Sequence, residues 1–106
     1  MRRDLHTGVL VGHWIHSHEE DVAGARVFRR AGFPFPRSRG RVGFEFAADG
    51  SFVEHGIGPT DRPTRTSGHW VLDPSGCRIT LKYRHGASGR EIRILSVEAD
   101  KLVLAQ

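Results

Sequence analysis

Residues 41–57 read RVGFEFAADGSFVEHGI, and this stretch decides the fold. Apolar and polar residues alternate on both sides of Asp49-Gly50, as they do in strands that bury one face. An Asp-Gly pair tolerates the positive φ angles that a tight two-residue turn requires. The stretch therefore predicts a β-hairpin that turns at Asp49-Gly50.

The remainder of the chain repeats this pattern at short intervals. Further strand signals lie at residues 8–18, 25–29, 65–72, 77–83, 90–97 and 101–105. Sequential antiparallel strands must hide their apolar faces, and no helix is expected that could cover them. Closure into a barrel hides those faces and removes exposed edges. We expect an all-β fold, a small antiparallel up-and-down β-barrel of about seven to eight strands. A two-sheet sandwich is the alternative.

The composition is that of one ordinary globular domain over residues 1–106. Hydrophobic residues make up 38% and charged residues 26%, and no apolar run approaches the roughly 18 residues of a membrane span. We therefore expect no membrane partner. The first residues make a poor signal peptide, and one cysteine allows no internal disulfide, so we expect a cytoplasmic protein. Cys77 is expected to be a small core residue.

Basic charge is concentrated in one segment. The net charge is +4, and residues 26–41 hold six arginines and no acid. Such a stripe suits nucleic acid, but no recognised nucleic-acid-binding motif surrounds it and acids occur through the rest of the chain. We therefore do not expect nucleic acid as a partner. The part of this segment at about 29–40, rich in Arg, Pro and Phe, reads as a long loop, and loops of that length often carry function.

Four motifs together resemble the small bacterial lipocalin-like (calycin) domains. They are GHW at 12–14, FAADGSF at 46–52, GHW at 68–70 and ILSVEADKLVL at 94–104. The resemblance covers most of the chain from Gly8 to Leu104, and the arginine-rich loop departs from it. It implies a lipocalin-like barrel, in which Trp14 and Trp70 are core plugs. That fold hosts carriers, inhibitors and a few enzymes, so the resemblance speaks for the fold more than for a function.

The direction of Trp14 decides which histidines face the interior. If Trp14 points inward, the two-residue period of a strand places His16 and His18 on the same side, toward one mouth of the barrel. His13 and His69 then point outward and are set aside. On the opposite wall, Phe52 is expected inside, which favours Glu54 as an inward polar group.

Three functions are compatible with these residues. Binding of a small, partly hydrophobic, anionic ligand in the barrel interior is the leading one. The interior contacts would be His16, His18, Phe44, Phe46, Phe52 and Thr66, with Arg37 or Arg39 holding the anion. In the second, an isomerase or cyclase type of enzyme uses His16, His18 and Glu54 in acid–base catalysis. The third is a divalent metal ion on His16 and His18, completed by Glu19, Glu54, His55 or His85. No cofactor is required by the leading function.

The long loop has two expected placements. If it crosses the barrel mouth, Arg37 or Arg39 can grip a carboxylate or phosphate. Alternatively, Phe33 and Phe35 cap the open end of the barrel while the arginines face water.

Two further expectations concern the surface. The acidic residues 19–21 either lie in solvent or pair with Arg29, Arg30 or Arg37 and so fold the loop over the mouth. The face opposite Trp14 in the first strand is apolar enough to meet a second copy of the chain, so a homodimer is a further expected partner. That face carries Val9, Val11 and Ile15.

Overall fold

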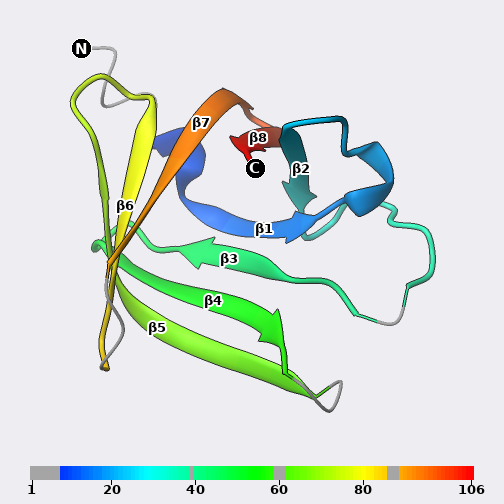
Figure 1. The fold of residues 1–106 in the computed structure, drawn as a ribbon, viewed down its shortest axis with the longest axis horizontal. Coiled ribbons are helices and arrows are strands. Elements are labelled where there is room, and N and C mark those ends of the chain that lie inside the picture. The colour runs from blue at the N-terminus through cyan, green and yellow to red at the C-terminus, as the bar shows by residue number, and fades with distance from the viewer. Residues whose placement is uncertain (1–7, 39, 59–61, 86–88) are drawn as a thin grey trace.

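In the computed structural model, which describes residues 8–38, 40–58, 62–85 and 89–106, eight antiparallel strands close into a barrel (Figure 1). The strands are β1 (Gly12–His16), β2 (Ala25–Arg30), β3 (Gly43–Phe46), β4 (Ser51–Ile57), β5 (Pro63–Leu72), β6 (Arg78–Tyr83), β7 (Arg90–Glu98) and β8 (Lys101–Ala105). A short 3₁₀ helix, η1 (His18–Glu20), follows β1. The predicted antiparallel β-barrel is therefore confirmed.

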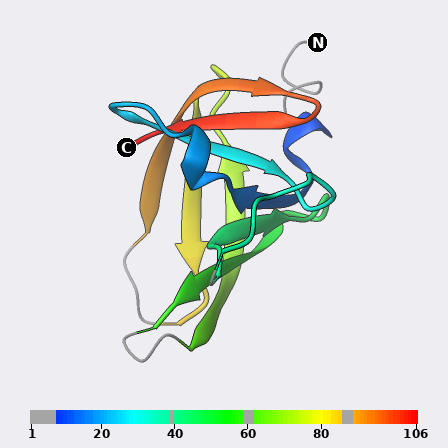
Figure 2. The same cartoon turned by 90° about the vertical axis from the view of Figure 1, so that its right-hand side faces the viewer.

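The order of the strands around the barrel explains the long loop. From β3 to β8 each strand pairs with the next, but β1 lies between β2 and β3, and β2 pairs with β8. Because β1 is antiparallel to both neighbours, β2 and β3 run parallel to each other. Parallel strands need a crossover of about a dozen residues. Residues 31–42 form that crossover, which faces the viewer in Figure 2.

The first strand is shorter than its sequence pattern. Residues 8–10 are helical, and β1 begins at Gly12 and ends at His16. This helical turn has a place in the packing, because Leu10 is fully buried and its carbonyl accepts a hydrogen bond of 2.9 Å from Trp14 Nε1. The chain before β1 therefore closes one end of the barrel against the indole of Trp14.

Trp14 is fully buried, as expected, and its ring is covered by Arg30 of β2. The Arg30 Cζ atom lies 3.9 Å from the ring centre, a distance at which a cation is attracted by the aromatic face. The guanidinium donates hydrogen bonds to the carbonyls of Val9, Val11 and Ala99. Gly12 makes room for it, since a Cβ there would lie 2.3 Å from Arg30 Nη1.

Aromatic and aliphatic side chains fill the interior of the barrel, Leu10 and Trp14 included. The buried core comprises Leu10, Trp14, Phe28, Phe44, Phe46, Phe52, Trp70, Ile79, Leu81, Ile92, Ile94, Leu102 and Leu104. The inward direction expected for Phe44, Phe46 and Phe52 agrees with this core. Cys77 differs from expectation: it is exposed, because it lies in the turn that precedes β6 and not within the strand.

Gly68 in the second GHW motif allows β5 and β6 to approach closely. A Cβ at this position would lie 2.0 Å from the carbonyl oxygen of Lys82, which belongs to the paired strand and cannot move independently. We predict that Gly68→Ala lowers the free energy of unfolding by about 1–3 kcal/mol, the usual cost of overpacking.

Gly32→Ala is the matched control, because a Cβ there has no neighbour within 4 Å. We expect it to change the free energy of unfolding by about 0.5 kcal/mol or less. Urea unfolding of both variants measures the difference. Equal effects of the two substitutions would contradict the close approach at Gly68.

Candidate functional site

Two hollows lie on opposite faces of the sheet formed by β1, β3 and β4. The first is the barrel mouth, the open end of the interior, bordered by Arg26, Phe28, Phe44, Glu54, Tyr83 and Arg90. The second is the loop groove, between the outer face of the sheet and the crossover connection, bordered by His13, Ile15, Phe35, Arg41, His55 and Ile57.

The polar residues of the barrel mouth continue the inner faces of their strands. Each stands two positions from a buried core residue: Arg26 from Phe28 and Glu54 from Phe52 are examples. Strand alternation therefore turns them inward, and at this end the apolar core stops. Three adjoining cavities result, with volumes of about 210, 370 and 340 Å³.

Glu54 joins two of the mouth residues. Its carboxylate accepts hydrogen bonds from Tyr83 Oη at 2.8 Å and from Arg90 Nη1 at 3.0 Å. Burial and then the bond to Glu54 raise the pKa of Tyr83. Burial is the largest influence on the pKa of Arg90 and acts to lower it, but the charge of Glu54 and the interactions with Tyr83 together outweigh burial and raise that pKa. At neutral pH the tyrosine is thus a hydroxyl and the arginine a cation.

Arg26 brings a second guanidinium to the mouth. It borders two of the three cavities, as does Arg90, and its Cζ atom lies 5.5 Å from the ring centre of Phe28. Within the described residues Arg26 forms no ion pair. Three guanidinium groups (Arg26, Arg90 and Arg93) and two side-chain carboxylates (Glu54 and Glu91) therefore border the mouth cavities among the described residues, so positive side-chain charge is in excess there.

His16 lies on the inner face, but its partner differs from the expected one. Its Nε2 atom is 2.9 and 3.1 Å from the two carboxylate oxygens of Asp21, not near Glu54. Burial lowers the pKa of His16, the bond to Asp21 opposes this, and the charge of Arg26 lowers it further. Neutral His16 therefore donates Nε2–H to Asp21, and Nδ1 remains as its second nitrogen.

The expectation that His18 continues the inner face is wrong. The strand ends because Ser17 is buried, with its backbone N–H bonded to the carbonyl of Val27 and its hydroxyl donating to Glu20. The chain then turns into η1, where the side chain of His18 is 49% exposed and lies 3.5 Å from Glu19. His16 and His18 have ring centres 6.0 Å apart, and within the described residues neither belongs to a cluster of three ligand groups whose atoms all lie within 4.8 Å of one another.

The remaining expected contacts are distributed over the molecule. Phe44 and Glu54 border the mouth, and Thr66 borders its third cavity. Phe46 and Phe52 are buried deeper, at 2% and 1% exposure. Arg37 is exposed on the crossover connection, and Arg39 lies outside the described residues. The mouth arginines are thus Arg26 and Arg90, which sequence reasoning had not selected.

The crossover connection lies over the outside of β1 instead of across the mouth. The loop groove beneath it has a volume of about 660 Å³, with Ile15 and Ile57 on the strands and Phe35 on the connection. Phe33 packs against Arg29 on the outer face of β2. The expected lid or cap over the barrel end is therefore wrong, because a β2-to-β3 crossover has to follow the outer face of β1.

Two arginine–carboxylate pairs hold this arrangement. Arg41 donates to both oxygens of Glu19, at 2.9 and 2.7 Å, and Arg29 donates to both oxygens of Glu20, at 2.8 and 2.7 Å. The bonds to these arginines lower the pKa of each glutamate to about 2. The pairing of the acidic run with Arg29 is thus as expected. Arg30 instead covers Trp14.

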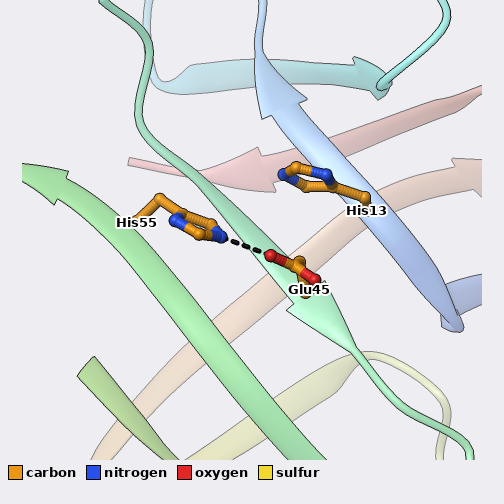
Figure 3. Close-up of side chains that lie close together, drawn as sticks. All are labelled: His13, Glu45 and His55. Carbon is orange, nitrogen blue, oxygen red and sulfur yellow. Dashed lines mark hydrogen bonds and ion pairs between the residues drawn. The ribbon is translucent and has the colours of Figure 1, made fainter. Parts of the chain in front are cut away.

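Three side chains meet at the edge of the loop groove, as Figure 3 shows: His13 of β1, Glu45 of β3 and His55 of β4. His55 Nε2 lies 2.5 Å from Glu45 Oε2, and the rings of His13 and His55 have centres 5.3 Å apart. Sequence reasoning set His13 aside as an exposed residue. Strand alternation could have identified the cluster: each of the three residues is next in the chain to a residue that points inward, so each points outward.

No protein-family model matches the chain, and no match was found among curated proteins or solved structures. Within the described residues, no helix has the length and apolar character needed to cross a membrane.

The lowered pKa of His16 predicts a pH dependence of stability. As the pH falls through 6.5, the unfolded chain takes up a proton at His16 before the folded protein does. This contribution is therefore fully present above pH 6.5 and is lost below it. We predict that His16→Gln makes the free energy of unfolding less dependent on pH between about 7.5 and 5 than in the wild type.

Urea unfolding at several pH values measures this dependence, with His69→Gln as the matched control on the exposed surface. The control should keep the wild-type dependence. A His16→Gln variant whose stability falls with acid as steeply as the wild type would refute the assignment.

Proposed function

We propose that the protein binds a small, partly hydrophobic, anionic ligand at the barrel mouth. The observation that carries the proposal is that Arg26 and Arg90 border the same two cavities, beside Phe44. Guanidinium forks suit carboxylates and phosphates, and a ring surface suits the apolar part of a ligand. Tyr83 and Thr66 add hydroxyl groups at the adjoining cavity.

The depth of the barrel restricts where such a ligand can lie. Trp14, Phe46 and Phe52 are at most 2% exposed, so the interior that they fill is closed to a ligand. The cavities at the mouth are small beside the roughly 300–1,000 Å³ of common ligand sites, although two of them share Arg26, Phe44 and Arg90. The proposal is therefore a ligand seated at the mouth, with its anionic group between the arginines.

The charge of the mouth favours it over the loop groove for this ligand. In the groove the guanidinium of Arg41 is already bonded to both oxygens of Glu19 and to two backbone carbonyls. An anion there would have to compete with a carboxylate. At the mouth Glu54 bonds only one of the two arginines among the described residues.

Membership of the lipocalin-like family is part of the same proposal. The closed eight-strand barrel and the two GHW motifs support it, with Trp14 buried and Gly12 and Gly68 at close contacts. A carrier or sensor of a small acid in the cytoplasm is the role that this assignment favours.

An acid–base enzyme of the isomerase or cyclase type is the second candidate. The observation that favours it is the His16–Asp21 pair, in which a carboxylate fixes the tautomer of an inward imidazole. Nδ1 of His16 would be the base. An activity lost in His16→Gln with ligand affinity retained would assign this function, whereas loss of affinity alone would assign binding.

Titration with 8-anilinonaphthalene-1-sulfonate, a fluorescent apolar anion, tests the binding proposal. We predict saturable binding with one probe per chain, and about tenfold weaker binding by Arg26→Gln and by Arg90→Gln. The expected loss is that of one charged hydrogen bond, about 1.5 kcal/mol.

Two control variants make the same change of charge elsewhere. Arg65→Gln alters an exposed arginine on β5 that borders no mouth cavity, and it should leave the dissociation constant within about twofold of the wild type. Arg37→Gln tests the placement expected from the sequence. Weaker binding by Arg37→Gln, with Arg26→Gln and Arg90→Gln unaffected, would move the anion from the mouth to the crossover connection. No saturable binding by the wild type would count against the proposal as a whole.

A further inference from the structure

We propose that His13, Glu45 and His55 form a site for one divalent transition-metal ion, such as Zn²⁺, on the outer face of the barrel (Figure 3). Their metal-binding atoms all lie within 4.8 Å of one another. Of its three residues only His55 also borders a cavity of the barrel mouth, and the site does not depend on the ligand proposed there.

The sheet brings the three side chains together. His13 and Glu45 are directly paired across β1 and β3, and His55 lies one diagonal step away, opposite Gly43. His13 and Glu45 point outward because their chain neighbours Trp14, Phe44 and Phe46 are buried, and His55 does so because its neighbour Glu54 turns toward the mouth. Residues on three adjacent hydrogen-bonded strands are held in a fixed arrangement, so the ligand atoms converge without a loop having to fold.

The donor set suits zinc. Two imidazole nitrogens and one carboxylate oxygen occur in open zinc sites, with metal–ligand distances of about 2.0–2.2 Å. A tetrahedral ion of that size places its ligand atoms roughly 3.3 Å apart. His55 Nε2 and Glu45 Oε2 are already 2.5 Å apart, and all three side chains are partly exposed and free to adjust by rotation.

The surrounding charges leave the carboxylate available. The bond to His55 lowers the pKa of Glu45 despite its partial burial, so the carboxylate is ionised at neutral pH. Arg65 lies opposite His55 on β5 and opposes a bound cation, but it is exposed and its charge is screened by solvent. Arg41, on the other side of the groove, is paired with Glu19.

Binding requires a defined change of protonation at His55. Its Nε2–H now donates to Glu45 in the short contact between the two side chains. In the neutral imidazole this proton would move to Nδ1, with water as the carrier, so that Nε2 and the carboxylate oxygen can both bind the metal ion. The existing hydrogen bond thus aligns the two groups that would share the ion.

The metal site lies at the edge of the loop groove. Both His13 and His55 border the loop groove, together with the apolar side chains of Ile15, Phe35 and Ile57. Three protein ligands leave one position open in a four-coordinate ion. That position would lie at the groove, where water or the donor atom of a small molecule can complete the coordination.

Calorimetric titration of chelator-treated, tag-free protein with Zn²⁺ tests the site, with Co²⁺ absorption as a second readout of a nitrogen- and oxygen-ligated ion. We predict one ion per chain for the wild type. His13→Gln, Glu45→Gln and His55→Gln should each weaken binding tenfold or more. His16→Gln and His69→Gln, which change histidines outside the cluster, should leave the affinity within about twofold of the wild type.

Three results would overturn the proposal: substoichiometric binding by the wild type, unchanged affinity in His13→Gln and His55→Gln, or a loss of affinity in His16→Gln. The last would place the ion on the inner side of β1. Binding of the fluorescent anion should be unchanged in His13→Gln and Glu45→Gln, because neither residue borders the mouth cavities, so failure of the metal site and failure of the mouth site are distinguishable.

Discussion

The stacking of Arg30 on Trp14 is the interaction on which the rest of the structure depends. The two residues are paired across β1 and β2, and Arg30 reaches over Gly12, where a side chain would collide with it. The guanidinium also bonds three backbone carbonyls, which ties the residues before β1 and the β7–β8 turn to the same point. Because the side chains of a strand alternate, fixing Trp14 inward places His16 inside and His13 outside.

The position of β1 between β2 and β3 has a second consequence. It forces residues 31–42 to cross the outer face of β1, which creates the loop groove and removes the loop from the mouth. Side chains that point inward from the barrel wall and side chains that point outward thus carry different chemical groups. The inner face ends in guanidinium groups suited to an anion, and the outer face gathers imidazoles and a carboxylate suited to a cation.

Local sequence patterns were sufficient for the parts of the fold that depend on local alternation. The hairpin at Asp49-Gly50, the inward Trp14 and the barrel itself follow from apolar faces that recur every second residue. The pairing of β1 with β3 could not be predicted from the sequence. The two strands are not consecutive in the chain, and turn residues indicate only where a strand ends, not which other strand it pairs with. That pairing also places Glu45 beside His13. β1 ends at His16, just before the buried Ser17. The two-residue period of the sequence continues past this point, so it does not predict where the strand ends.

A double-mutant cycle between Trp14 and Arg30 tests the account most directly. The free energies of unfolding of Trp14→Leu, Arg30→Met and the double variant would be compared with that of the wild type. We predict that the two residues are coupled by about 1 kcal/mol or more, as expected for a cation stacked on a desolvated indole. Additive effects, within about 0.3–0.5 kcal/mol, would show that the stack does not hold β1 in place and would contradict the assignment of its two faces.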